Sequence, residues 1–111
     1  IKAYITEKFG YDLSSTVDLI RPEYRFNETC QNTVPQALLC FLEADSFEDA
    51  IRNAISIGGD SDTIGAIVGG IAEAKFGIPD EIAQMGWAYL PSDMRKVMTD
   101  LYAISLSRKG A

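Results

Sequence analysis

Apolar residues recur at helical spacing along most of the chain, and no segment shows the alternation that is typical of a strand. The clearest stripes are those of residues 34–44, where Val34, Leu38 and Phe41 share a face, and of the segment that starts at Phe47. The pattern predicts helices over residues 1–9, 34–44, 47 to the Gly58-Gly59 pair, about 62–76, 80–88, and from Ser92 onward. Residues 11–32 have no clear period, and we expect a long irregular connection there.

Helix boundaries are marked by residues that satisfy the free backbone groups at helix ends. Thr33 with Gln36 predicts a capping box for the second helix, and Ser46 with Asp49 predicts the same device for the third. Gly10 and Gly77 stand where helices are expected to end.

The segment of about 62–76 is rich in glycine and alanine and almost free of polar side chains. Gly65 and Gly69 stand four residues apart, a spacing that lets a neighbouring helix approach closely. The sequence therefore predicts an all-α fold, a compact multi-helix orthogonal bundle around a central helix that is buried on most sides. In the last helix, the stripe of Met94, Met98 and Tyr102 is expected to mark the buried side.

Composition removes several classes of function. The 111 residues carry a net charge of -6 and no histidine, which argues against nucleic-acid binding and excludes a Ser-His-Asp triad and imidazole-ligated zinc. The longest apolar-or-glycine run, 64–72, is about half of what a bilayer requires, so no membrane association is expected. Cys30 and Cys40 are interpreted as ordinary buried thiols of a cytoplasmic protein. Chemistry would have to rely on carboxylates, hydroxyls and hard cations.

The segment "GGDSDT", residues 58–63, carries the residues best suited to such chemistry. Asp60, Asp62 and Thr63 would hold three oxygen-bearing side chains together at a helix start, which suits Mg²⁺. The alternative interpretation is a helix cap, because aspartate at this position also satisfies free amides. An EF-hand loop is excluded, since Ile64 and Ile71 stand where oxygen ligands are needed.

"SIGGDSDTIGAIVGGIAEAKFGIP", preceded by "VPQALLCFLEADSFEDAIRNAI", closely resembles the C-terminal half of the ADP-ribosylglycohydrolases over roughly residues 28–85. The resemblance implies an all-α hydrolase that uses two Mg²⁺ ions to release ADP-ribose from a modified protein side chain such as arginine or serine. It places the metal ligands on Asp60, Asp62 and Thr63, with Asp62 contacting both ions. Gly59 permits close backbone approach of a ligand, and we expect it to contact the substrate.

The same resemblance implies that residues 1–111 form only the C-terminal part of the domain. A Thr-Asp-Asp cluster and the acidic catalytic partner belong to an N-terminal half, so no catalytic residue beyond the metal ligands is expected here. We expect the 111 residues alone to hold Mg²⁺ weakly and to be inactive, with that half and ADP-ribose or an ADP-ribosylated protein as partners. The alternative is a catalytically silent helical scaffold or an ADP-ribose-binding module.

Two further features carry open alternatives. Tyr11, Tyr24 and Phe26 could stack on adenine, but aromatic residues in such a loop more often simply pack. Glu28 precedes a helix that the family uses near its cleft, and a solvated glutamate is the better interpretation.

Overall fold

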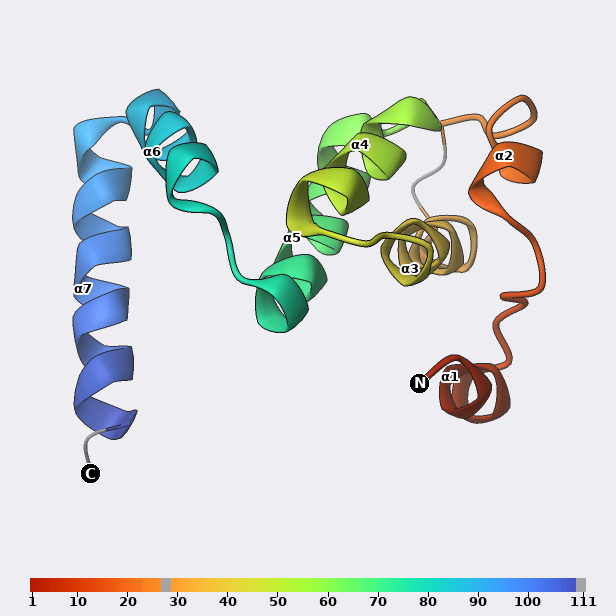
Figure 1. The fold of residues 1–111 in the computed structure, drawn as a ribbon, viewed down its shortest axis with the longest axis horizontal. Helices are drawn as coiled ribbons and strands as arrows, with labels where there is room; N and C mark the ends of the chain where they lie inside the picture. The colour runs from red at the N-terminus through yellow and green to blue at the C-terminus, as the bar shows by residue number, and fades with distance from the viewer. Residues whose placement is uncertain (27–28, 110–111) are drawn as a thin grey trace. The chain divides into compact units, whose positions relative to one another are not determined.

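The computed structural model describes residues 1–26 and 29–109 and divides the chain into two units, Ile1–Ile78 and Pro79–Ala111. The first unit contains α1 (Lys2–Phe9), α2 (Val17–Ile20), the short 3₁₀ helix η1 (Cys30–Asn32), α3 (Val34–Leu42), α4 (Phe47–Ser56) and α5 (Ser61–Phe76). The second contains α6 (Asp80–Tyr89) and α7 (Ser92–Lys109) (Figure 1). The residues described include no strand, which confirms the all-α prediction.

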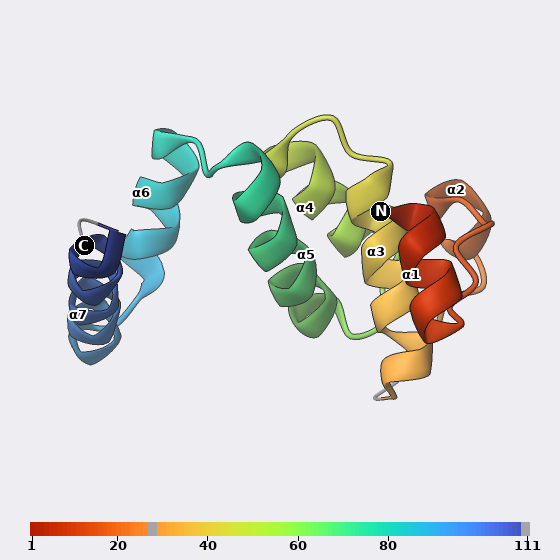
Figure 2. The same cartoon turned by 90° about the horizontal axis from the view of Figure 1, so that it is seen from below.

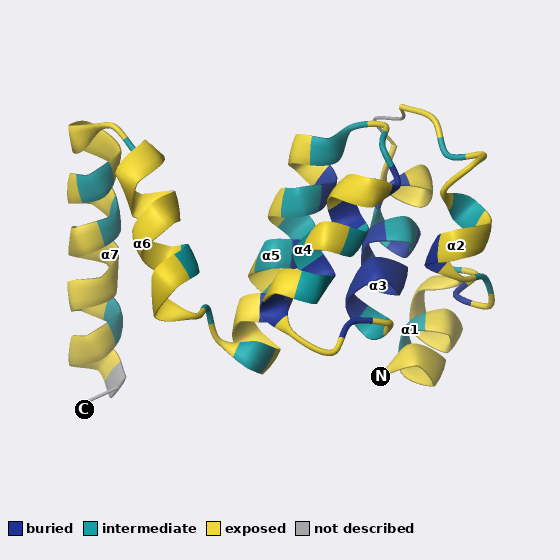
Figure 3. Ribbon diagram, turned by 45° about the horizontal axis from the view of Figure 1, so that its top comes forward, coloured by how far each residue is buried: buried dark blue, intermediate teal, exposed yellow. Residues whose placement is uncertain are grey.

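The core of the first unit lies where α3, α4 and α5 pack against one another (Figures 2 and 3). Helix α5 contributes Ile64, Val68 and Ala72, which are completely buried and stand four residues apart on one face. The facing surfaces of α3 and α4 supply most of the remaining buried side chains, among them Ala37, Leu39, Cys40, Phe41, Ala50 and Ala54. Burial of this apolar surface is the main force that holds the three helices together.

Gly65 and Gly69 of α5 behave as their spacing predicts. A Cβ atom at Gly65 would lie 3.5 Å from the Ile55 Cδ1 atom, and one at Gly69 would lie 3.4 Å from the Ile51 Cδ1 atom. Both glycines therefore face α4 and allow the two helices to approach closely.

The prediction that α5 is buried on most sides is wrong for this structure. Ala66, Gly70 and Ala74 are exposed along the helix. The physical reason is that its main packing partners, α3 and α4, cover one face.

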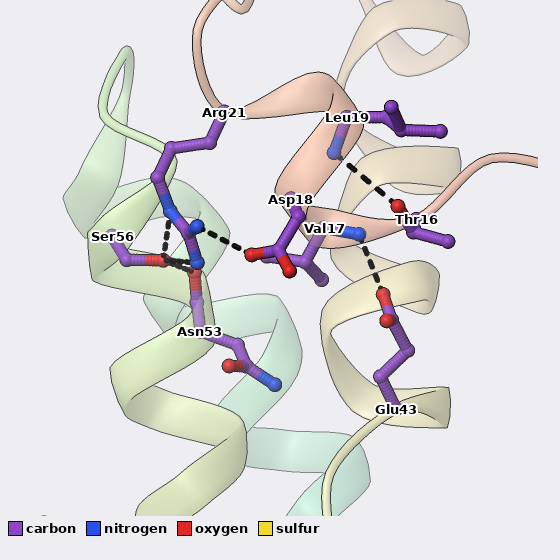
Figure 4. Close-up of polar contacts among 8 residues, drawn as sticks. All are labelled: Thr16, Val17, Asp18, Leu19, Arg21, Glu43, Asn53 and Ser56. Carbon is purple, nitrogen blue, oxygen red and sulfur yellow. Dashed lines mark hydrogen bonds and ion pairs between the residues drawn. The ribbon is translucent and has the colours of Figure 1, made fainter.

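The irregular segment before α3 contains the short helix α2, which the sequence did not reveal. Helix α2 begins after Thr16, whose side chain accepts the Leu19 amide, and the Glu43 carboxylate accepts the Val17 N–H at 2.6 Å (Figure 4). Arg21 pairs with Asp18 at 2.7 Å. It also donates to the hydroxyl oxygen of Ser56, which ties α2 to the end of α4.

The two predicted capping boxes have different outcomes. Ser46 accepts the Asp49 amide at 3.1 Å, as expected. Thr33 makes no side-chain cap bond at the start of α3, so that prediction is wrong. The Thr33 hydroxyl instead shares a hydrogen bond with the side chain of Tyr24, a contact between residues nine apart that helix spacing does not reveal.

The second unit is a pair of helices joined at Leu90 and Pro91. Arg95 fixes the connection, because its guanidinium donates to the carbonyl oxygens of Trp87 and Ala88 at 3.1 Å each. The expected buried side of α7 is wrong: Met94 and Tyr102 are about half exposed, at 53% and 49%, and Met98 is only partly covered. Neither α6 nor the described part of α7 contains a buried residue, so the two helices do not cover each other's apolar side.

Two smaller expectations are also settled by the structure. Cys40 is buried as predicted, whereas Cys30 is exposed, so the interpretation of both as buried thiols holds for one alone. None of the helices in the described part of the chain is long and apolar enough to cross a bilayer.

Candidate metal centre

The GGDSDT segment forms the turn between α4 and α5 and the first turn of α5. Gly58 and Gly59 have φ angles of 75° and 67°, in the left-handed region that glycine adopts without strain. Asp60 is the N-cap residue of α5, and Asp62 and Thr63 lie in its first turn. The structure therefore brings all three predicted metal ligands to one helix end.

The two carboxyl groups lie close enough to interact directly. The neighbouring Asp60 side chain lowers the pKa of Asp62, and the Thr63 amide, which donates to the Asp62 carboxylate at 2.9 Å, lowers it further. Asp60 makes no side-chain cap bond, so the interpretation of this residue as a capping side chain is wrong. The free amides at the start of α5 therefore receive no hydrogen bond from the Asp60 carboxyl.

A second Ser-Asp pair in the chain shows what is particular to this site. Asp93 occupies the same position in α7 as Asp62 does in α5, the second residue of the helix after a serine. Its carboxylate likewise accepts the amide of the next residue at 2.9 Å. The bond between Asp62 and Thr63 is therefore ordinary helix-start geometry. The two sites differ in the residue before the serine, which is Asp60 at the start of α5 and Pro91 at the start of α7.

The donor set fits a hard divalent cation in its chemistry. Two carboxylates and a hydroxyl are oxygen ligands of the kind that Mg²⁺ prefers, and water or substrate commonly completes its octahedron. Within the described residues, no group of three or more histidine, cysteine, aspartate or glutamate side chains is placed to hold a metal ion. The segment can thus supply one side of a coordination shell.

Tyr24 is the neighbour of this loop that sequence reasoning did not assign to it. A Cβ atom built on Gly59 would overlap the Tyr24 ring, so the ring fills the space beside this glycine. The Tyr24 hydroxyl donates to the Asn32 carbonyl oxygen at 2.9 Å. Partial burial raises the pKa of Tyr24, and the charge of Asp60 raises it further. The expected substrate-binding role of Gly59 stays a prediction.

Tyr11 and Phe26, the other aromatic residues of this segment, have different surroundings. Tyr11 stacks on Phe9 with ring centroids 6.1 Å apart, and Phe26 is 60% exposed. Tyr11 and Tyr24 thus have packing partners within the chain, and stacking on adenine stays a prediction for all three aromatic residues. Glu28 lies outside the described residues.

A cavity of about 500 Å³ lies beside the start of α3, within the range of ligand pockets. Its walls include Tyr11, Asp12 and Gln36, and none of the three predicted metal ligands lines it. A neighbouring cavity of about 380 Å³ is lined by Tyr24 and Gln36. The Gln36 Oε1 atom is buried and has no hydrogen-bond partner within the described part of the chain.

Comparison with known proteins identifies the family of this chain. The family model for ADP-ribosylglycohydrolase matches residues 6–106. An uncharacterized protein from Archaeoglobus fulgidus is 33% identical over 78 residues, which cover 69% of this chain and 21% of that protein. The matched segment thus spans about a fifth of its relative, and no solved structure matches significantly. With nearly its whole length matched by the family model, the chain belongs to the ADP-ribosylglycohydrolase family.

Proposed function

We propose that the protein containing this chain is a Mg²⁺-dependent hydrolase that removes ADP-ribose from modified protein side chains. The observation that carries the proposal is the paired carboxyls of Asp60 and Asp62 on the first turn of α5, with Thr63 beside them. Family membership supplies the reaction class, cleavage of a glycosidic bond to ADP-ribose.

The chain's own residues would act by holding and orienting. Asp60 and Asp62 supply negative charge on a backbone that is fixed by the packed helix α5, and the Thr63 hydroxyl adds a neutral oxygen. When bound, Mg²⁺ would orient the distal ribose through its hydroxyls and acidify water for attack at the anomeric carbon. Aspartate is ionised at neutral pH, which is the state that a cation requires, and the pKa of Asp62 lies below its ordinary value because of the Asp60 side chain and the Thr63 amide.

Two carboxylates and one hydroxyl supply part of a coordination shell, so we propose that the remaining ligands lie in another part of the protein. The match spans about a fifth of the related Archaeoglobus fulgidus protein, so most of that relative lies outside the matched segment, which supports this arrangement. It also favours the second candidate, in which residues 1–111 by themselves serve as a silent scaffold or bind ADP-ribose without cleaving it.

The test is release of ADP-ribose from an arginine-modified and a serine-modified protein, with Mg²⁺ and with EDTA. Asp62→Asn is expected to lower the rate roughly 100-fold or more, because metal ligation contributes several kcal/mol to the transition state. Asp93→Asn is the matched control, since it has the same helix position and amide bond, and its rate should stay within about two-fold of wild type. An unchanged rate for Asp62→Asn would show that the metal assignment is wrong. Binding of ADP-ribose without release would favour the silent module.

A further inference from the structure

Tyr24 contacts the metal-loop backbone one residue before the first carboxylate. A Cβ atom at Gly59 would lie 2.9 Å from the Tyr24 Cδ2 atom, nearer still to Cε2, and 3.4 Å from the Arg25 carbonyl carbon. The ring and the backbone that follows it therefore enclose Gly59 on one side. Because Gly59 directly precedes Asp60, this contact limits where the peptide that carries the Asp60 side chain can lie.

The other end of the Tyr24 side chain is held by the start of α3. Its hydroxyl donates to the Asn32 carbonyl oxygen at 2.9 Å and shares a hydrogen bond with Thr33, which is only 5% exposed. The tyrosine backbone is fixed as well, because its amide donates to the Ile20 carbonyl oxygen at 2.8 Å. One half-buried side chain thus connects the α3 start to the turn before α5.

Helix α5 itself does little to fix the direction of the Asp60 side chain. Asp60 has non-helical backbone angles, φ -82° and ψ 70°, and no cap bond to the free amides of α5. The position of its carboxyl beside Asp62 follows from the backbone that leaves Gly59. A contact that fixes the Gly59–Asp60 backbone therefore also fixes the Asp60 carboxyl beside that of Asp62.

We propose that Tyr24 is a positioning residue for the metal site, which it serves by fixing the Gly59–Asp60 backbone so that the two carboxyls face one cation. The proposal rests on the proposed function, in which these carboxyls bind Mg²⁺. Mg²⁺ demands near-ideal octahedral geometry, so a small displacement of one ligand lowers affinity. Groups that orient metal ligands commonly change affinity by about 10- to 100-fold when they are removed.

The experiment measures the Kd for Mn²⁺, a paramagnetic substitute for Mg²⁺, by electron paramagnetic resonance on the purified protein. Tyr24→Ala removes both ring and hydroxyl and is expected to raise the Kd about 10-fold or more. Tyr24→Phe keeps the ring against Gly59 and should raise the Kd less. Tyr4→Ala is the control, since Tyr4 is 63% exposed on α1, and it should leave the Kd unchanged.

Asp62→Asn in the same titration separates the two proposals. If Asp62→Asn weakens Mn²⁺ binding and Tyr24→Ala does not, the metal site stands and the positioning role is overturned. If Asp62→Asn has no effect, the metal assignment is wrong and the positioning role falls with it. Circular dichroism melts accompany every titration, and Tyr24→Leu, with the same expected increase in Kd, replaces Tyr24→Ala if the alanine variant does not fold.

Discussion

Gly58 and Gly59 provide a matched pair for testing the geometry of the metal loop. Both have positive φ, 75° and 67°, so alanine at either position meets the same backbone strain. They differ in their surroundings, because a Cβ atom at Gly58 has no neighbour within 4 Å and one at Gly59 overlaps the Tyr24 ring. The difference between the two alanine variants therefore isolates the contact with Tyr24.

The expected losses in the free energy of unfolding follow from backbone strain at both glycines and from overpacking against Tyr24 at Gly59. A left-handed conformation costs an L-residue about 1–2 kcal/mol, so Gly58→Ala should lower the free energy of unfolding by that amount. Overpacking adds about 1–3 kcal/mol, so Gly59→Ala should cost roughly 2–5 kcal/mol in total. The ring cannot move aside freely, because its hydroxyl is bonded to the Asn32 carbonyl oxygen.

Urea unfolding followed by circular dichroism measures both variants, and the slope of each transition shows whether it remains two-state. The double variant Gly59→Ala/Tyr24→Ala is expected to cost less than the sum of its single changes by about 1–3 kcal/mol, because the overlap is removed. Equal costs for Gly58→Ala and Gly59→Ala, or strict additivity in the double variant, would refute the reasoning. In that case Tyr24 would not confine the loop.

Three further predictions concern the rest of the first unit. Burial, with a smaller contribution from the charge of Glu43, raises the pKa of the Cys40 thiol to about 11. Iodoacetamide at pH 8 should therefore label the exposed Cys30 and spare Cys40, as read from a peptide map. Equal labelling of the two cysteines would contradict this prediction. The pKa of Asp12 lies below 3.8 because the hydroxyl and the amide of the serine two residues later bond to its carboxylate. Its stabilising contribution should therefore be present above about pH 4 and vanish as the pH falls through the folded-state pKa, and the stability difference from Asp12→Asn across a pH series checks this. Glu43→Ala removes the acceptor at the start of α2 and should cost about 1–2 kcal/mol in urea unfolding, whereas Glu48→Ala, which breaks an exposed pair, should cost no more than about 0.5 kcal/mol.

Helical periodicity and capping residues predicted the helices whose own sequences show an apolar stripe or a recognisable start. Ser46 and Asp49 mark the start of α4, and the predicted central helix, about 62–76, differs by one residue at its start from α5 at Ser61–Phe76. Helix α2 escaped prediction because it has four residues, too few for a period to emerge, and depends on the Glu43 carboxylate 26 residues away from the Val17 amide. Periodicity states which face of a helix is apolar, and it does not state what covers that face. The expectations for the exposed face of α5 and for α7 were wrong for this reason.

The candidate site divides in the same way between local and non-local information. Asp60, Asp62 and Thr63 are local to one another, so the sequence alone predicted that they would gather at a helix start. The residue that supports them, Tyr24, lies 36 positions before Asp60 in a segment without period. The glycine pair was a signal that backbone would approach something closely, yet nothing in the sequence identifies that neighbour as a side chain of the same chain.

The comparison of the two Ser-Asp helix starts shows how far local structure alone defines a site. Asp62 and Asp93 have the same helix position and the same amide bond, so neither the motif nor the helix end distinguishes a metal ligand from an ordinary surface aspartate. What distinguishes Asp62 is a second carboxyl held beside it, which requires Asp60 to turn away from the free amides of its own helix. The orientation of Asp60 depends on the Gly59 backbone, and the ring of Tyr24, from a distant segment of the chain, limits where that backbone can lie. In this chain the candidate metal chemistry therefore depends on tertiary packing, and a peptide of residues 56–70 alone should not reproduce the carboxyl pair.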